Sequence, residues 1–149
     1  WITSPYFVPG RSMLESLSAA ALRGVDVRVM VPRKADSRVM TLAAQSYYPD
    51  LLRAGVRVFE YEAGFVHAKT MLVDDWLGTV GSANMDVRSF HLNWELNAFV
   101  FGRDFVSELA AQYRSDMEQS REATERPETL REVPKELMRM AARLATPIL

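Results

Sequence analysis

Cysteine is absent from the 149-residue chain and histidine occurs only twice, which limits the chemistry that the protein can perform. Without cysteine, disulfides and thiolate metal sites are excluded. No apolar run approaches the ~20 residues that a membrane-spanning helix needs, and no signal peptide is visible. The net charge of −1 lacks the basic excess typical of nucleic-acid-binding domains. We therefore expect no metal, no cofactor and no nucleic-acid partner.

The chain also lacks an initiator methionine, because it opens at Trp1 with residues typical of the inside of a strand. We expect it to be a piece of a longer protein. Its content of 48% hydrophobic and 25% charged residues is typical of a folded globular domain. The length suits one domain of ordinary size.

Apolar spacing predicts an alternation of strands and helices in the first half of the chain. The order strand, helix, strand, helix, strand is typical of an α/β layer with a parallel sheet. The expected elements are strand 1–8, helix 12–23, strand 25–31, helix 37–54 interrupted near Pro49, strands 56–61, 66–73, 77–81 and 95–101, and helices 105–121 and 135–145. The sequence thus predicts one α/β domain over 1–149, with a mixed, mostly parallel sheet flanked by helices. It carries a C-terminal helical extension over about 122–149.

The strongest local pattern pairs His67 and Lys69 on one expected strand and Ser82 and Asn84 just after the next. Side chains two apart on a strand project to the same face, so each pair is expected to act together. A tight turn at Asp74 would bring the two strands side by side, with Asp74 facing away from His67. We therefore predict that an imidazole, an ammonium, a hydroxyl and an amide converge on one spot.

These groups suit a phosphodiester. Lys69 offers a compact positive charge, and Ser82 and Asn84 offer neutral donors to phosphate oxygens. Donors aimed at charge that builds in the transition state often make the largest catalytic contribution. His67 is suited to attack phosphorus or to protonate a leaving alkoxide, because imidazole titrates near neutrality.

The complete string His-x-Lys-x₄-Asp-x₆-Gly-Ser-x-Asn, from His67 to Asn84, resembles the signature of the phospholipase D superfamily. The continuation Asp-x-Arg-Ser-Phe-x-Leu-Asn-x-Glu, which ends at Glu95, resembles the bacterial cardiolipin synthase branch. The Ser-Pro-Tyr-Phe-Val-Pro segment before Gly10 and the residues around Gly24 and Gly64 are similar to the same branch. The resemblance extends along nearly the whole chain.

This resemblance implies a role for each matching residue. In the superfamily two such motifs face each other across a pseudo-two-fold axis, one histidine forming a phospho-histidine and the other serving as acid and base. His67 matches one of that pair, Lys69 and Asn84 match phosphate-binding positions, and Ser82 matches a hydroxyl beside them. Glu95 matches a carboxylate that orients a catalytic imidazole. Asp74 is expected to be structural.

Only one motif is present, since no lysine stands two residues after His91. One half-site cannot supply both nucleophile and acid, so a second half is expected. It either precedes this segment in the same chain, which we favour, or comes from a second copy in a homodimer. This half alone would then expose the apolar surface between the halves.

The resemblance implies phosphatidyl transfer, most simply cardiolipin synthesis from two phosphatidylglycerol molecules, at the bacterial cell membrane with the domain facing the cytoplasm. Alternatives are a phospholipase D that uses water as acceptor, a single-motif homodimeric nuclease, and a non-enzymatic half-domain. A basic stripe on the helix over 135–145 is compatible with a membrane surface or with a solvated helix face. Tyr6 is expected in the core or pocket wall, and Arg33, Lys34 and Asp36 lie in a loop that could border the site.

Overall fold

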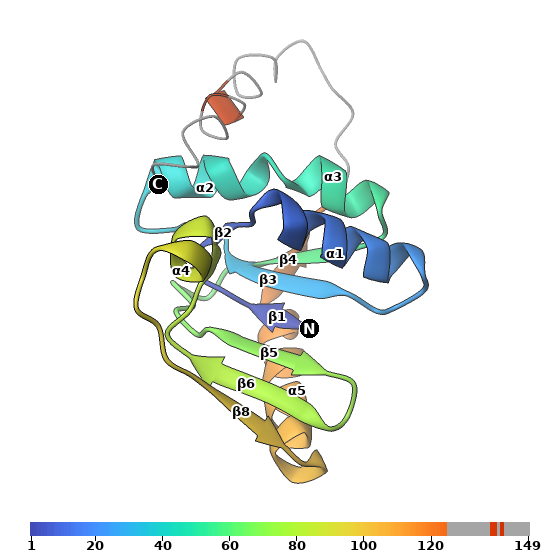
Figure 1. The fold of residues 1–149 in the computed structure, drawn as a ribbon. Coiled ribbons are helices and arrows are strands. Elements are labelled where there is room, and N and C mark those ends of the chain that lie inside the picture. Colours follow the sequence, from blue (N-terminus) through green and yellow to red (C-terminus); the bar gives the residue numbers. More distant parts are fainter. Residues whose placement is uncertain (125–137, 140, 142–149) are drawn as a thin grey trace.

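The computed structural model describes residues 1–124, 138, 139 and 141, and within them a central β-sheet lies between two layers of helices (Figure 1). The sheet has the strand order β8-β6-β5-β1-β3-β4-β9 among the described residues. Helices α1, α2 and α3 lie on one face, and α5 lies on the other (Figure 1). A mixed α/β domain with a flanked sheet is therefore confirmed. Most of the predicted helix over 135–145 and most of the predicted extension lie outside the described residues; residues 138, 139 and 141, which are described, are helical.

The first part of the chain builds the parallel part of the sheet. Strands β1 (Ile2–Thr3), β3 (Arg28–Pro32) and β4 (Arg57–Tyr61) pair in parallel. They are linked by α1 (Arg11–Leu22), α2 (Arg38–Gln45) and α3 (Tyr48–Arg53). The main core lies between these strands and helices, where Val29, Val58 and Leu51 are fully buried.

The middle of the chain builds an antiparallel part. Strands β5 (Thr70–Val73), β6 (Leu77–Gly81) and β8 (Asn97–Phe101) pair antiparallel and join the rest through β1 and β5. Helix α5 (Arg103–Glu118) packs on one face, where its Val106 and Ala110 contact Leu72. A Cβ at Gly78 would lie 2.6 Å from the Phe105 ring, so glycine allows the close approach of helix and strand.

Several predicted boundaries were wrong. The strand predicted over 1–8 is interrupted: β1 ends at Thr3, and β2 (Phe7–Val8) pairs with β7 (Met85–Asp86) in a separate small sheet. The strand predicted from Val66 begins at Thr70, so His67 and Lys69 lie in the segment that leads into β5. The short helix α4 (Val87–His91) and the edge strand β9 (Ser120–Glu122) were not predicted. Their short lengths leave too little periodicity to detect.

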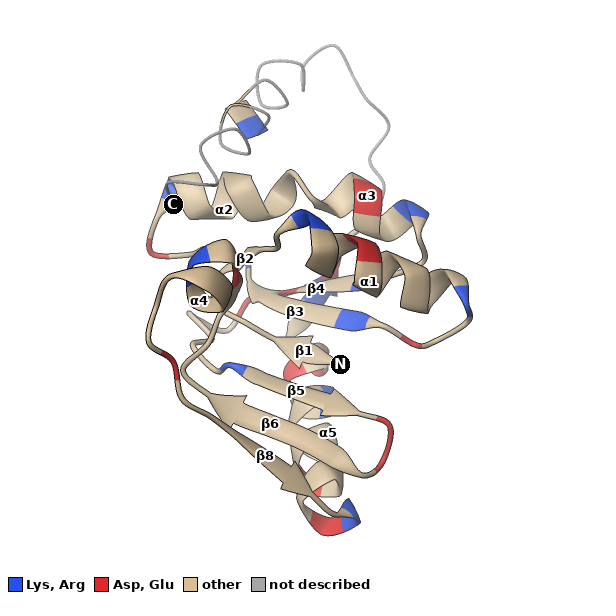
Figure 2. Ribbon diagram, in the orientation of Figure 1, with Lys and Arg blue, Asp and Glu red and all other residues tan. Residues whose placement is uncertain are grey.

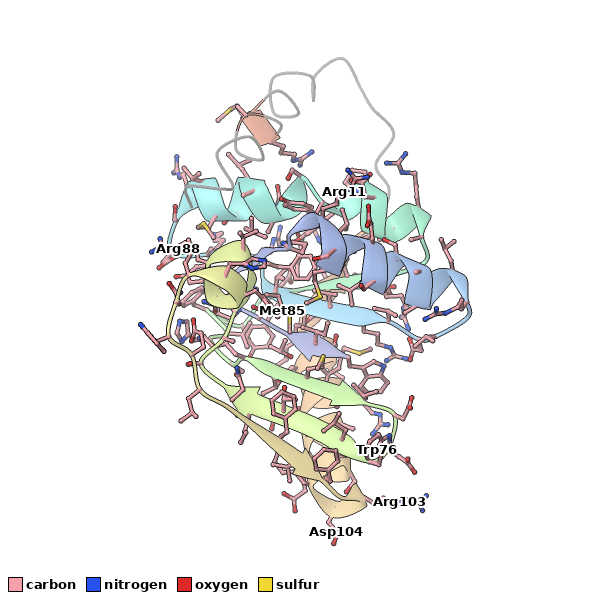
Figure 3. The ribbon with its side chains drawn as sticks, viewed as in Figure 1. Arg11, Trp76, Met85, Arg88, Arg103 and Asp104 are labelled. Carbon is pink, nitrogen blue, oxygen red and sulfur yellow. The ribbon has the colours of Figure 1, made fainter. Side chains whose placement is uncertain are left out.

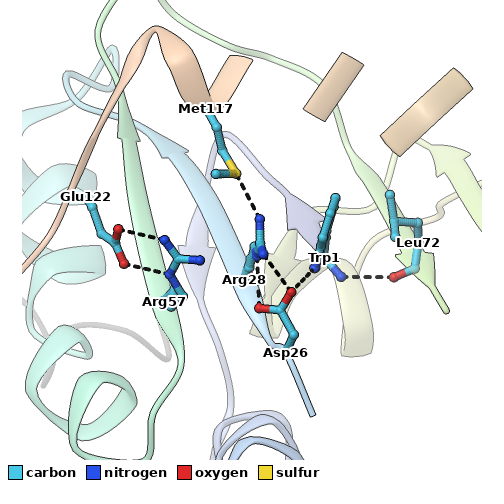
Figure 4. A network of polar contacts seen from close by, with 7 residues as sticks. All are labelled: Trp1, Asp26, Arg28, Arg57, Leu72, Met117 and Glu122. Atoms are coloured by element: carbon cyan, nitrogen blue, oxygen red, sulfur yellow. Dashed lines mark hydrogen bonds and ion pairs between the residues drawn. The ribbon is translucent and has the colours of Figure 1, made fainter. Parts of the chain in front are cut away.

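A polar network around Trp1 joins the two parts of the sheet to α5 (Figure 4). The indole Nε1 donates to Asp26 at 3.0 Å, and the Arg28 guanidinium lies 4.2 Å from the centre of the indole ring. Arg28 also forms an ion pair with Asp26 and donates to the Met117 sulfur. Trp1, directly before β1, is thereby linked to β3 through Arg28 and, through Arg28, to Met117 of α5, which holds β1 in the sheet.

Candidate active site

His67 and Lys69 lie together where the chain enters β5. The Lys69 Nζ is 3.1 Å from Nδ1 and 3.4 Å from Nε2 of His67, and it donates to the His67 carbonyl oxygen at 3.0 Å. Partial burial lowers the pKa of Lys69, while the nearby Glu95 carboxylate acts in the opposite direction. The ammonium and the imidazole can therefore contact one common ligand.

Ser82 follows β6 directly and is fixed by the start of the next strand. Its backbone amide donates to the Leu96 carbonyl at 3.0 Å, and the Leu96 amide donates to its hydroxyl at 2.9 Å. The Ser82 hydroxyl in turn donates to Glu95. Ser82 is thus held between β6 and the segment before β8, next to Glu95, whose charge also acts on Lys69.

Glu95 receives several hydrogen bonds. Besides Ser82, the Ser89 hydroxyl donates to its Oε1 at 2.8 Å and the Asn93 amide donates at 3.2 Å. These bonds, led by the one from Ser82, hold the pKa of Glu95 below its ordinary value, so the group stays a carboxylate. No contact joins Glu95 to His67 among the described residues, and the predicted role in orienting an imidazole stays a prediction.

Asn84 lies between β6 and β7, and its backbone amide donates to the Ser89 hydroxyl at 3.1 Å. Its side-chain Oδ1 is buried and has no hydrogen-bond partner in the described part of the chain. Since buried amide atoms are nearly always paired, this end of Asn84 is a candidate ligand position. Oxygen and nitrogen exchange places when the amide is rotated by 180°, so a bound group could meet a donor there.

Asp74 lies at the other end of β5, in the β5–β6 turn. Its φ of 53° is the only positive value found at a non-glycine residue in the described chain. Asp74 therefore shapes a tight turn far along the strand from Lys69, a placement compatible with the structural role that we predicted for it.

Three further groups surround His67 or support the site. The ring of Tyr6 stands edge-on to the imidazole, with ring centroids 6.4 Å apart at 87°, and Phe65 lies 5.4 Å from the same imidazole. The Tyr6 hydroxyl donates to Asp36 at 2.7 Å. Tyr6, and through it Asp36, therefore lie near His67, while their places in a pocket wall and at its border stay predictions. Phe65 was missed, although it lies two residues before His67.

Ser89 was not predicted as a site residue. Asp86 caps helix α4 by accepting the Ser89 amide at 2.7 Å, which turns the Ser89 hydroxyl toward Glu95 and Asn84. The spacing of Asp86 and Ser89 is that of a helix N-cap and its N3 residue, a signal that could have found this short helix.

No group of three potential metal ligands occurs within the described residues. In the same part of the chain, no helix has the length and apolar character needed to cross a bilayer.

The sequence profile of a family described as "Cardiolipin synthase, PLD-like domain" matches residues 1–119. Among curated relatives, cardiolipin synthase 2 of Bacillus anthracis is 48% identical over 122 residues, covering 82% of this chain and 24% of the relative. Cardiolipin synthase A of Pseudomonas putida is 42% identical over all 149 residues, which are 31% of its length. The chain therefore spans about a quarter to a third of these relatives.

Two solved structures share the fold. Nuc of Salmonella typhimurium, a phospholipase D family member, superposes with a TM-score of 0.69 at 21% identity, covering 83% of this chain and 80% of Nuc. A phosphatidylserine synthase of Haemophilus influenzae gives 0.68 at 18% identity, covering 99% of this chain and 41% of that enzyme. With the profile match over 119 of 149 residues, the chain belongs to the phospholipase D-like domain family of cardiolipin synthases.

Proposed function

We propose that this domain is one half-site of a phosphatidyltransferase that joins two phosphatidylglycerol molecules into cardiolipin through a phospho-histidine. The observation that carries the proposal is the contact of the Lys69 ammonium with the His67 imidazole, 3.1 Å away. Ser82 and the unpaired end of Asn84 add polar groups on neighbouring segments. The names of the curated relatives support phospholipid as the substrate.

The reaction needs two imidazoles. One imidazole nitrogen forms a bond to the phosphorus of phosphatidylglycerol while the phosphorus–oxygen bond to glycerol breaks, and the leaving alkoxide takes a proton from the second imidazole. The hydroxyl of a second phosphatidylglycerol then gives its proton to that second imidazole. The hydroxyl oxygen forms a bond to phosphorus, and the bond between phosphorus and the first imidazole breaks. Lys69 and Asn84 would bind the non-bridging oxygens, whose charge grows in the transition state.

The second imidazole must come from outside this segment. His91 lies exposed on α4 and has no lysine two residues later. Glu95 likewise has no imidazole partner among the described residues, so the histidine that it orients in this proposal would belong to a second half-site. The relatives are three to four times longer than the matched region, which supports a second half in the same chain.

The face of β5, β6 and β8 that lies opposite α5 is the proposed contact surface for that second half. Leu72 points to α5, so its neighbours Met71 and Val73 point to the opposite face. On that face Phe99 is 61% and Phe101 is 65% exposed. Figure 2 shows these three strands almost entirely in the tan of uncharged residues. We name the exposed group Val73, Trp76, Phe99 and Phe101 the apolar face.

The apolar face extends away from α4. Trp76 stacks on Phe101 with ring centroids 5.3 Å apart. Figure 3 places Trp76 near Arg103 and Asp104, at the end of the sheet remote from Arg88 on α4. An exposed apolar group of this kind, on a sheet face that no helix covers, suits an interface with a permanent partner.

The same proposal places the domain at the bacterial membrane, where its phospholipid substrates lie, and we propose that it faces the cytoplasm. Accessibility of an engineered cysteine at exposed Glu15 to an impermeant thiol reagent, in intact and in permeabilised cells, would test this orientation. Labelling only after permeabilisation supports the cytoplasmic side, and labelling of intact cells would contradict it.

Turnover of phosphatidylglycerol by the full-length chain in detergent tests the function. We expect cardiolipin and glycerol as products, loss of turnover in His67→Asn, and little change in the matched variant His91→Asn. Mass spectrometry of rapidly quenched enzyme should detect a phosphatidyl group on one histidine. Phosphatidic acid without cardiolipin would instead indicate a phospholipase D. Salt-sensitive cleavage of DNA with no action on lipid would indicate a nuclease.

A further inference from the structure

We propose that Tyr6 is a positioning residue for His67, whose imidazole it holds by an edge-on ring contact while Asp36 anchors the phenol. The expected effect on turnover rests on the proposed function; the contact itself does not. Tyr6 does not touch the reacting atoms in this proposal, and its part is to restrict the angles that the imidazole can adopt.

The backbone of Tyr6 is held on both sides. The Ser4 hydroxyl donates to the Tyr6 carbonyl oxygen at 2.7 Å and accepts the Met85 amide at 3.0 Å. Directly after Tyr6, Phe7 pairs with Met85 in the small sheet of β2 and β7. Ser4 and Phe7 are buried, with 0% and 1% of their surface exposed. The interruption between β1 and β2 therefore places Tyr6 rigidly beside the segment that follows Asn84.

The phenol is held at its other end by Asp36, which lies in the loop after β3. The hydrogen bond from the Tyr6 hydroxyl to Oδ2 of Asp36 is 2.7 Å long. It raises the pKa of Tyr6 to about 12, so the hydroxyl remains a donor across the physiological range. Because Tyr6 is held at its backbone and at its hydroxyl, the orientation of its ring is fixed.

Two aromatic rings lie against the imidazole. Tyr6 and Phe65 lie 6.2 Å apart, and both contact His67, with centroid distances of 6.4 Å and 5.4 Å. The perpendicular Tyr6 contact has the edge-to-face geometry that aromatic pairs prefer. Lys69 lies against both ring nitrogens. His67 has no carboxylate partner among the described residues, so the two aromatic rings and Lys69 are what restrain it.

The first test measures the reactivity of His67 and needs no catalysis. Diethyl pyrocarbonate acylates neutral imidazoles, and a peptide map of the full-length protein reports His67 and His91 separately. In Tyr6→Leu we expect the ratio of His67 to His91 acylation to rise about two- to tenfold, the range that loss of one ring pair allows. Tyr6→Phe and Asp36→Ala should each give a smaller, similar rise. Asp36→Asn, which retains an acceptor, should match the wild type.

The second test measures turnover in the same preparations. A positioning role predicts that Tyr6→Leu lowers kcat about tenfold, with KM for phosphatidylglycerol nearly unchanged. Asp36→Asn should restore most of the kcat that Asp36→Ala loses. The control Phe90→Leu removes an exposed aromatic ring from α4 that makes no ring contact with His67 among the described residues, and it should change neither measurement.

An unchanged His67 to His91 ratio in Tyr6→Leu overturns the proposal. If Tyr6→Leu does not accumulate as folded protein, the variants Tyr6→Phe and Asp36→Ala replace it in the test. A wild-type ratio of His67 to His91 acylation in both of them overturns the proposal. Should the ratios respond as expected while the wild-type enzyme transfers no phosphatidyl group, the proposed function fails and the positioning role stands.

Discussion

The hydroxyl of Ser89 lies 2.8 Å from Oε1 of Glu95 and couples the short helix α4 to the carboxylate beside Lys69. The same hydroxyl accepts the backbone amide of Asn84. One buried oxygen thus fixes two of the groups that the proposed mechanism uses.

Ser89→Ala should therefore affect both stability and turnover. Loss of the hydroxyl leaves the Asn84 amide without its acceptor, a change that costs about 1–3 kcal/mol when the group is buried. We expect a lower melting temperature of the full-length protein and a reduced kcat. Ser107→Ala, which removes an exposed hydroxyl from α5, is the matched control. Equal melting temperatures and rates in the two variants would contradict the coupling.

Lys69→Met should reduce phosphatidyl transfer about 10²- to 10³-fold, the effect typical of removing one donor from a transition-state site. The methionine nearly preserves the side-chain volume and removes the charge, so the fold should be retained. Steady-state kinetics with phosphatidylglycerol measures the loss. Arg11→Met, which removes an exposed charge from the start of α1, is the control. A loss confined to KM would mean that Lys69 binds the substrate and the transition state equally strongly.

Gly78→Ala should destabilise the protein, because the added Cβ would meet the Phe105 ring at 2.6 Å. Overpacking of this kind costs about 1–3 kcal/mol. Thermal denaturation of the full-length chain measures it. In Gly10→Ala, by contrast, the new Cβ lies at an ordinary 3.5 Å from Val87, so a small effect is expected. A melting temperature at the wild-type level in Gly78→Ala would show that α5 can move away from β6.

Phe99→Ser tests the apolar face. If a second half covers this surface, the substitution removes a buried ring from the full-length protein, at a cost of about 1.5–3 kcal/mol. The melting temperature and turnover should both fall. Val80→Ser changes an exposed apolar residue on the opposite face of the neighbouring strand β6 and should have a smaller effect. Indistinguishable results for the two variants would argue against an interface on the Phe99 side.

Stability should depend on pH through Glu122, which joins β9 to β4. Its carboxylate pairs with Arg57 at 2.8 Å, and this hydrogen bond holds the pKa of Glu122 below its ordinary 4.5 (Figure 4). A depressed pKa in the folded state contributes stability above pH 4.5, which is lost as the pH falls through the folded value.

Glu122→Gln should therefore melt at a slightly lower temperature than the wild type at pH 7, by no more than the ~1 kcal/mol of an exposed ion pair. The difference should vanish once the wild-type carboxyl is protonated. Glu108→Gln on the exposed side of α5 is the control. A difference that persists unchanged at low pH would assign the effect to something other than the ion pair.

The sequence by itself determined the order of the main elements and supplied the candidate groups of the site. Local periodicity predicted α1, β3, β4 and α5, because side-chain spacing along one element depends only on nearby residues. The spacing from His67 to Asn84 likewise selected the residues whose segments lie side by side in the structure.

Only the tertiary structure decided how long-range partners meet. In the folded chain the opening strand is interrupted at Ser4–Tyr6, β2 pairs with β7, and the Tyr6 ring lies against His67. The Glu95 carboxylate likewise accepts hydrogen bonds from Ser82 and Ser89 and makes no contact with His67 among the described residues. Strand partners and ring contacts are set by packing between segments far apart in sequence, and a two-residue strand has no periodicity of its own to reveal them.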